Sequence, residues 1–156
     1  MIDDMGNETQ PTWEWAVEHV IGHHNLDMPS KSKEPYVNLF DSGLYANLGR
    51  AAWAELNTIR GVPKWELQDQ VRLMAGKQHD YGHANVLRFG ADGVLVRLWD
   101  KIARYTNLKN RAQTYTVAAV NESLSDTLVD IVGYVIIYFM VLNGSFSYPL
   151  ADDVVV

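Results

Sequence analysis

Three acidic residues spaced four apart, Glu122, Asp126 and Asp130, are the residues of this chain best suited to chemistry. Side chains four apart on a helix lie about one turn from each other, so these carboxylates form a single negative stripe. No Lys or Arg follows Arg111, so the compensating positive charge must come from elsewhere. Hard oxygen ligands suit Mg²⁺ or Mn²⁺, and the stripe therefore predicts a divalent metal site.

A second motif, Lys77-x-x-Asp80-Tyr81-Gly82, lies about forty positions earlier in the chain. Its ordinary explanation is the charged last turn of a helix, where the helix dipole favours Lys77 but disfavours Asp80. Asp80 is thus an anomaly that a metal would explain, and Lys77 is suited to hold a phosphate as a point charge. The predicted metal ligands are Asp80, Glu122, Asp126 and Asp130.

A third group of charges, Arg97, Asp100, Lys101 and Arg104, forms one face of a predicted helix. Taken alone, such a face is typical of an exposed helix with local ion pairs. Beside the acidic stripe, its cations could equally serve as counter-ions to carboxylates or as clamps on phosphates. Tyr81, next to a turn, is the preferred aromatic for stacking on a base. The predicted substrate-binding residues are Lys77, His79, Tyr81, Arg97, Lys101 and Arg104.

An alternative interpretation of the acidic stripe is a solvent-facing set of acids near a helix N-terminus, where the dipole favours them. This interpretation suits Glu122. It suits Asp130 poorly, because Asp130 lies among apolar residues and would be drawn toward the core, where a carboxylate needs a partner or a metal.

The elements that must position these residues are all predicted to be helical, because no stretch of strand-like alternation is long enough to form a sheet. We expect one domain over residues 1–156, built as a bundle of about five helices, with N-terminal helices of unknown role in 12–60 and a nucleotide- and metal-binding core in 64–142. Thr12 is the predicted cap of the first helix. The predicted helices span 13–24, 42–59, about 63–81, 94–108 and 117–142, with a long loop over 25–40 and a linker containing Gly90 and Gly93.

Two features of the last predicted helix bear on its surroundings. Leu124, Leu128, Ile131, Val135 and Leu142 fall opposite the acidic stripe on a helical wheel, and beyond Asp130 the helix is apolar all round. One small domain seldom encloses such a helix alone, so we expect a homodimer or higher homo-oligomer. The apolar run 131–142 is shorter than the roughly 20 residues of a membrane span, which predicts a buried helix and no membrane contact.

Composition narrows the class of protein further. The chain has 156 residues, a formal net charge of -6 and no cysteine. Its acidity argues against direct nucleic-acid binding, which normally needs a basic surface. The absence of cysteine excludes disulfide scaffolds and thiolate chemistry. The N-terminus is acidic and polar, unlike a secretory leader, and we expect a cytoplasmic protein.

The three motifs, taken in order, resemble the phage "nucleotide modification associated" domain family. The resemblance covers roughly residues 66–142 and includes Lys77-x-x-Asp80-Tyr81-Gly82, Arg97-x-x-Asp100-Lys101-x-x-Arg104 and Glu122-Ser-x-x-Asp126-Thr-x-x-Asp130-x-x-x-Tyr134. More distantly, the chain is similar to the all-α nucleoside triphosphate pyrophosphohydrolases of the MazG and dimeric dUTPase type, which hold Mg²⁺ on acidic helices. It differs from them in its acidic spacing, which is four rather than three.

The resemblance implies a MazG-like fold and a Mg²⁺-dependent (or Mn²⁺-dependent) hydrolase of a (deoxy)nucleoside triphosphate, yielding monophosphate and pyrophosphate in phage nucleotide metabolism and acting in the host cytoplasm. Glu122 and Asp126 would be catalytic, as metal ligands or, for Glu122, as the base. One alternative is a noncatalytic nucleotide-binding protein, a sensor or sponge. Another is a structural dimer whose stripe is paired with Arg97 and Lys101.

Overall fold

The computed structural model describes residues 5–6, 10–28, 42–111 and 117–154, and its regular structure is all helical. Within these residues no strand occurs, so the predicted all-α class and the number of long helices are confirmed. The predicted 25–40 loop lies largely outside the described residues. The elements are α1 (Trp13–His23), α2 (Ser42–Leu56), α3 (Leu67–Tyr81), α4 (Ala84–Asn110), α5 (Val117–Asn143), and the short 3₁₀ helices η1 (Ser145–Ser147) and η2 (Ala151–Asp153).

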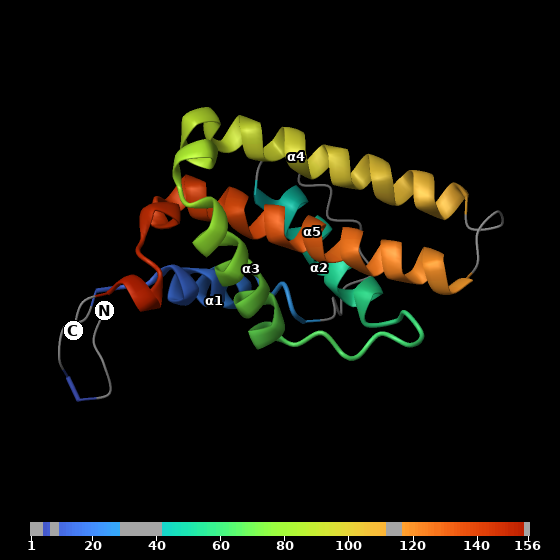
Figure 1. Ribbon diagram of the computed structural model, residues 1–156, viewed down its shortest axis with the longest axis horizontal. Coiled ribbons are helices and arrows are strands. Elements are labelled where there is room, and N and C mark those ends of the chain that lie inside the picture. The colour runs from blue at the N-terminus through green and yellow to red at the C-terminus, as the bar shows by residue number, and fades with distance from the viewer. Residues whose placement is uncertain (1–4, 7–9, 29–41, 112–116, 155–156) are drawn as a thin grey trace.

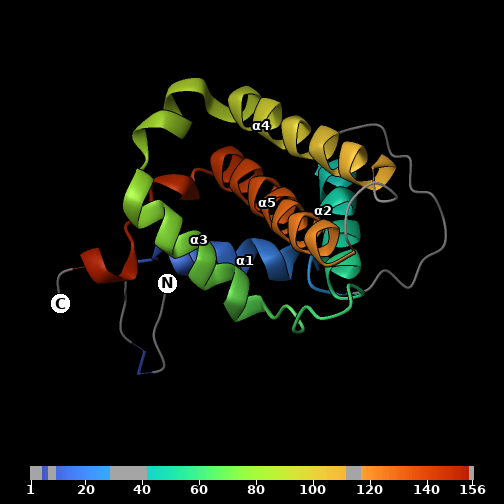
Figure 2. The ribbon, with the colours of Figure 1, turned by 45° about the vertical axis from the view of Figure 1, so that its right-hand side comes forward.

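Helix α5 runs through the centre of the molecule, with α1, α2, α3 and α4 arranged around it (Figures 1 and 2). Four of the five residues predicted to face the core are buried, and Val132, Val135, Ile136 and Met140 are fully shielded. The prediction is wrong for Leu142, which is 56% exposed because it lies in the last turn, where α5 ends at Asn143 and Gly144 turns the chain away.

The chain itself encloses much of the apolar half of α5, which removes one argument for a dimer; the oligomer stays a prediction. By length and composition alone, Asn121–Asn143 could cross a membrane, and half of its most apolar 18-residue window is buried inside the fold. The core helix of a soluble protein and a membrane span both pass such a test. The expected absence of membrane contact therefore also stays a prediction.

Helix α1 is anchored at the start of its first turn to the other end of the chain. The Thr12 hydroxyl accepts a hydrogen bond from the backbone N–H of Trp15 at 3.1 Å, which confirms the predicted N-cap. The backbone N–H of Trp13 donates to the carbonyl of Pro149 at 2.7 Å, and the Trp13 ring packs edge-on against Phe146. These contacts bring Trp13, only 1% exposed, to the wall of the site described below.

Helix α3 begins at Leu67, four residues later than predicted from Pro63. The reason is that the segment before it is held extended by the end of α2: the Trp53 indole donates to the Trp65 carbonyl at 3.1 Å, and the Trp65 N–H donates to the Asn57 side chain at 2.6 Å. Glu66 then caps the helix in a reciprocal capping box with Asp69. Helix α2 correspondingly ends at Leu56 rather than at residue 59.

A sharp turn at Gly82 joins α3 to α4. Gly82 has a positive φ of 69°, which glycine adopts readily, and the exposed residues Asp80 and Tyr81 lie directly before it at the end of α3. The predicted linker before residue 94 is wrong: α4 already begins at Ala84 and bends only at Gly90, where φ is 66° and ψ is -157°. Gly93 continues the helix, so one glycine alone supplies the break.

Candidate functional site

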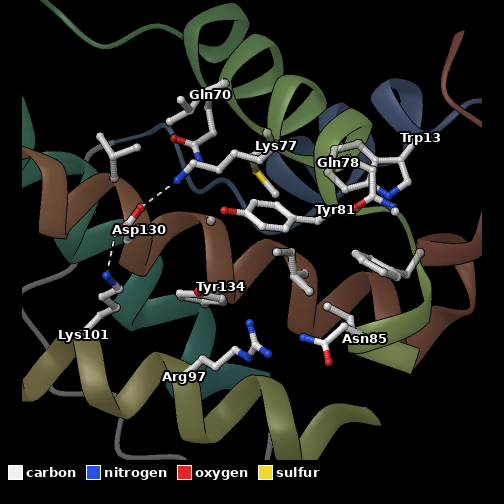
Figure 3. A pocket seen from close by; sticks show the side chains of 18 residues that line it. Trp13, Gln70, Lys77, Gln78, Tyr81, Asn85, Arg97, Lys101, Asp130 and Tyr134 are labelled. Carbon is white, nitrogen blue, oxygen red and sulfur yellow. Dashed lines mark hydrogen bonds and ion pairs between the residues drawn. The ribbon is translucent and has the colours of Figure 1, made fainter. Parts of the chain in front are cut away.

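A cavity of about 360 Å³ lies where α3, α4 and α5 meet, and α1 and η1 contribute to its wall. Three cationic side chains line it: Lys77 from α3, and Arg97 and Lys101 from α4. Asp130 from α5 is the single carboxylate among the lining residues. Figure 3 shows these four side chains around the same space. The formal charge of the lining is therefore positive, which suits an anionic ligand.

Asp130 is the charged centre of the cavity. Its Oδ1 lies 3.1 Å from the Lys77 ammonium, and its Oδ2 lies 3.0 Å from the Lys101 ammonium. Each carboxylate oxygen thus has its own lysine, one from α3 and one from α4 (Figure 3). The Asp130 side chain is 23% exposed, against 52% for Lys77, so the pair stays within reach of solvent. This arrangement neutralises Asp130 with side chains of the chain itself.

Two tyrosines and the amides of Gln78 and Asn85 add further polar groups to the wall. Tyr81 from α3 and Tyr134 from α5 both line the cavity, and Figure 3 shows Tyr81 reaching across it while Arg97 rises from α4. Gln78 lies against the cavity and contacts the His83 ring nitrogen through its own side-chain nitrogen at 2.7 Å. Asn85 lines the cavity from the first turn of α4. Aromatic faces beside fixed cations can bind a planar ring that carries a phosphate.

The inner wall contains two buried side-chain donors, the indole nitrogen of Trp13 and the amide nitrogen of Gln70, which have no partner among the described residues. The orientation of the Gln70 amide follows from the Trp65 indole, which donates to its oxygen at 2.8 Å. The Gln70 nitrogen faces Gly133 of α5, where an added Cβ would come within 3.6 Å of it. An unpaired buried donor costs about 1–3 kcal/mol, so this wall is not optimised for stability.

The structure divides the predicted residues unevenly between the cavity and the surface. Four of the six predicted substrate-binding residues line it: Lys77, Tyr81, Arg97 and Lys101. His79 is exposed and pairs with Asp80 at 3.6 Å. Arg104 instead donates to the Thr127 hydroxyl of α5 at 3.2 Å.

The predicted metal ligands are not gathered in one place. Asp130 is the one member of the predicted set that lines the cavity, while Asp80, Glu122 and Asp126 are exposed outside it. In the part of the chain that the structure describes, no group of three or more His, Asp or Glu side chains is placed to hold a metal ion. The alternative interpretation, in which basic side chains pair with the acidic stripe, agrees better with the position of Asp130 than metal binding does. Lys101 is one of the two partners expected under that interpretation, but the second partner is Lys77 rather than Arg97.

The residues predicted from the sequence did not include four polar side chains of the cavity wall: Trp13, Gln70, Gln78 and Asn85. A signal for the two glutamines existed, because both fall near Met74 on the buried side of α3, where a polar side chain is unusual. No local signal could find Trp13, because its place at the cavity depends on contacts with Pro149 and Phe146.

Comparison with known proteins adds nothing to this geometry, since no protein family, no curated protein and no solved structure matches the chain significantly. The resemblance drawn from the three motifs therefore stays a prediction.

Proposed function

We propose that this protein binds a nucleotide, or a closely similar organic phosphate, in the cavity between α3, α4 and α5. The observation that carries the proposal is the convergence of Lys77, Arg97 and Lys101 from two helices on one space that contains a single carboxylate. Phosphate oxygens are bound in proteins by such ammonium and guanidinium groups, with arginine adding directional hydrogen bonds.

The remainder of the lining supports a ligand with both a ring and a phosphate. Tyr81 and Tyr134 offer aromatic faces, and Gln78 and Asn85 offer amide groups that can pair with the edge of a base. A volume of about 360 Å³ lies at the lower end of the range of small-molecule sites, roughly 300–1,000 Å³. Binding without turnover, as in a sensor or a sponge, requires nothing more than these groups.

Hydrolysis of a nucleoside triphosphate with Mg²⁺ is the second candidate, and the acidic stripe of α5 favours it. Glu122 and Asp126 lie two turns and one turn before Asp130 on the same helix. The donors do not fit a magnesium ion as they are placed, however, because Glu122 and Asp126 are exposed outside the cavity and both oxygens of Asp130 are ion-paired with lysines. We therefore derive no catalytic step through a metal.

Calorimetric titration tests the binding proposal. Wild-type protein is titrated in chelator with nucleoside mono- and triphosphates of each base, and the bound ligand is recovered and identified by chromatography. We expect saturable binding of at least one nucleotide, recovered intact. Arg97→Met should weaken it about tenfold, because a charge-assisted hydrogen bond to phosphate is lost.

The matched control is Arg104→Met, which removes the same charge from the same helix, outside the cavity. It should change the affinity by less than about twofold. Equal losses in the two variants would mean that general charge, and not the cavity, attracts the ligand. The absence of binding to any nucleotide would refute the proposal.

The same reaction mixtures with Mg²⁺ or Mn²⁺ in place of chelator test hydrolysis. The second candidate expects monophosphate and pyrophosphate as products, and it fails if turnover does not exceed that of Asp126→Ala.

A further inference from the structure

The two lysine contacts of Asp130 point to a role for this residue that differs from metal binding. Lys77 and Lys101 stand on different helices, and the cavity wall links α3 to α4 electrostatically through the Asp130 carboxylate between them. Two ammonium groups, each facing one oxygen of a shared anion, form the arrangement that a phosphate group also requires. The Asp130 carboxylate thus lies between the same two ammonium groups that a ligand's phosphate would contact.

We propose that Asp130 is a built-in competitor that holds the phosphate subsite until a ligand's phosphate takes over Lys77 and Lys101. This inference rests on the proposed function and specifies the subsite within that cavity. A carboxylate carries one negative charge, whereas a phosphate monoester or pyrophosphate group carries close to two or more, so the more highly charged group has the stronger attraction to two cations.

The consequence is selectivity for highly charged phosphates. A weakly charged anion gains too little from the two lysines to displace a carboxylate that is already 3.0–3.1 Å from both of them. A bound phosphate also feels repulsion from Asp130, which remains nearby on α5. Asp130 therefore lowers the affinity for every anion while it raises the discrimination between them, a balance of the kind that makes specificity depend on a repulsive element.

This role and the metal-ligand role predict opposite results for the same substitution. If Asp130 helped to bind a phosphate through Mg²⁺, its neutralisation would weaken binding. If Asp130 competes with the phosphate, its neutralisation strengthens binding, and no metal is needed.

The test is the affinity of inorganic pyrophosphate, measured by calorimetry in chelator, for wild type, Asp130→Asn and Asp126→Asn. Both substitutions remove one negative charge from α5, one turn apart, so their long-range effects are nearly equal. We expect Asp130→Asn to bind pyrophosphate about tenfold more tightly than wild type. Asp126→Asn should differ from wild type by less than about twofold, because Asp126 is exposed outside the cavity.

A second substitution and a second measurement guard against loss of folding. Asp130→Ser should show the same gain, and adding Lys101→Met to Asp130→Asn should abolish it. In wild type, saturating pyrophosphate should shift the ¹³Cγ resonance of Asp130 but leave that of Asp126 in place. An unchanged Asp130 resonance, or an affinity of Asp130→Asn no higher than that of Asp126→Asn, overturns the inference.

These outcomes separate the inference from the proposed function. If wild type binds a nucleotide but Asp130→Asn shows no gain, only the inference fails. If Asp130→Asn gains pyrophosphate affinity but neither form binds any nucleotide, only the nucleotide proposal fails. If neither form binds either ligand, both fail.

Discussion

The acidic side chains of α2 and α5 differ in whether other side chains pair with them. Asp130 and Glu55 each have two partners on other turns or helices, whereas Glu122 and Asp126 face solvent. Glu55 of α2 accepts the Tyr105 hydroxyl at 2.5 Å through one oxygen and the Lys109 ammonium at 3.1 Å through the other. This contact ties the last turn of α2 to the C-terminal part of α4, through residues that do not line the cavity.

The Tyr105–Glu55 contact predicts a specific loss of stability at high pH. Burial, then the hydrogen bond and the charge of Glu55, raise the pKa of Tyr105 to about 12. Because the unfolded pKa is near 10, this contribution is complete below about pH 10 and is lost as the pH rises toward 12. The melting temperature of wild type should therefore fall more steeply over that interval than that of Tyr105→Phe.

The control for this measurement is Tyr81→Phe, which removes a solvent-exposed hydroxyl. It should retain the wild-type dependence on pH. If Tyr105→Phe retains it too, the hydrogen bond contributes nothing that the pH can remove.

Among the elements, α4 supplies two of the three cations of the site, and its first turn adds the lining residues Asn85 and Val86. Those contributions come from either side of the bend at Gly90. The turns over 84–89 and the turns after Gly90 therefore do not share one straight axis, and both parts of α4 line the cavity.

Substitution of Gly90 tests the bend. Its φ of 66° and ψ of -157° lie in a region that is almost restricted to glycine. An added Cβ would meet nothing within 4 Å, so the cost is conformational rather than steric. Gly90→Ala should lower the free energy of unfolding by about 1–3 kcal/mol in urea titrations.

Gly76→Ala is the matched control, because Gly76 lies inside α3 and its added Cβ also meets nothing within 4 Å. It should raise the free energy of unfolding by about 0.5–1 kcal/mol, since alanine favours helix over the unfolded chain. Equal effects of the two substitutions would show that the bend imposes no strain on alanine.

At the scale of the whole molecule, the predicted homodimer or higher homo-oligomer has to use a surface other than the buried side of α5. Large apolar side chains are exposed along α4: Phe89 by 63%, Val96 by 65% and Trp99 by 48%. Phe89, Gly93 and Val96 all border one hollow on α4. An exposed apolar group of this kind often marks a protein contact.

Light scattering across a concentration series tests this prediction. We expect wild type to form a dimer and Val96→Glu to shift it toward the monomer, because a charge on the contact surface is desolvated at a cost. Leu44→Glu, at another exposed apolar position, on α2, should leave the dimer intact. A monomeric wild type, or a Val96→Glu dimer of unchanged stability, would contradict the prediction.

The helices could largely be predicted from the sequence, because the spacing of apolar residues along the chain indicates both where a helix forms and which of its sides is buried. The last helix was expected over 117–142 and spans Val117–Asn143, with Leu124, Leu128, Ile131 and Val135 buried. Thr12 was correctly predicted as the N-cap of the first helix. The errors at Pro63 and before residue 94 arose where a contact from another element, or a single glycine, overrode the local pattern.

The candidate site could be predicted only in part, and the acidic stripe shows why. Glu122, Asp126 and Asp130 are equally spaced in the chain and alike in chemistry. Only Asp130 lies opposite both Lys77 and Lys101. The sequence alone determined which residues carry charge and that a helix presents them. The tertiary structure decided which of these charges has partners, through the places at which α3 and α4 pack against α5. Electrostatic attraction depends on distance, and these distances are set only by long-range packing.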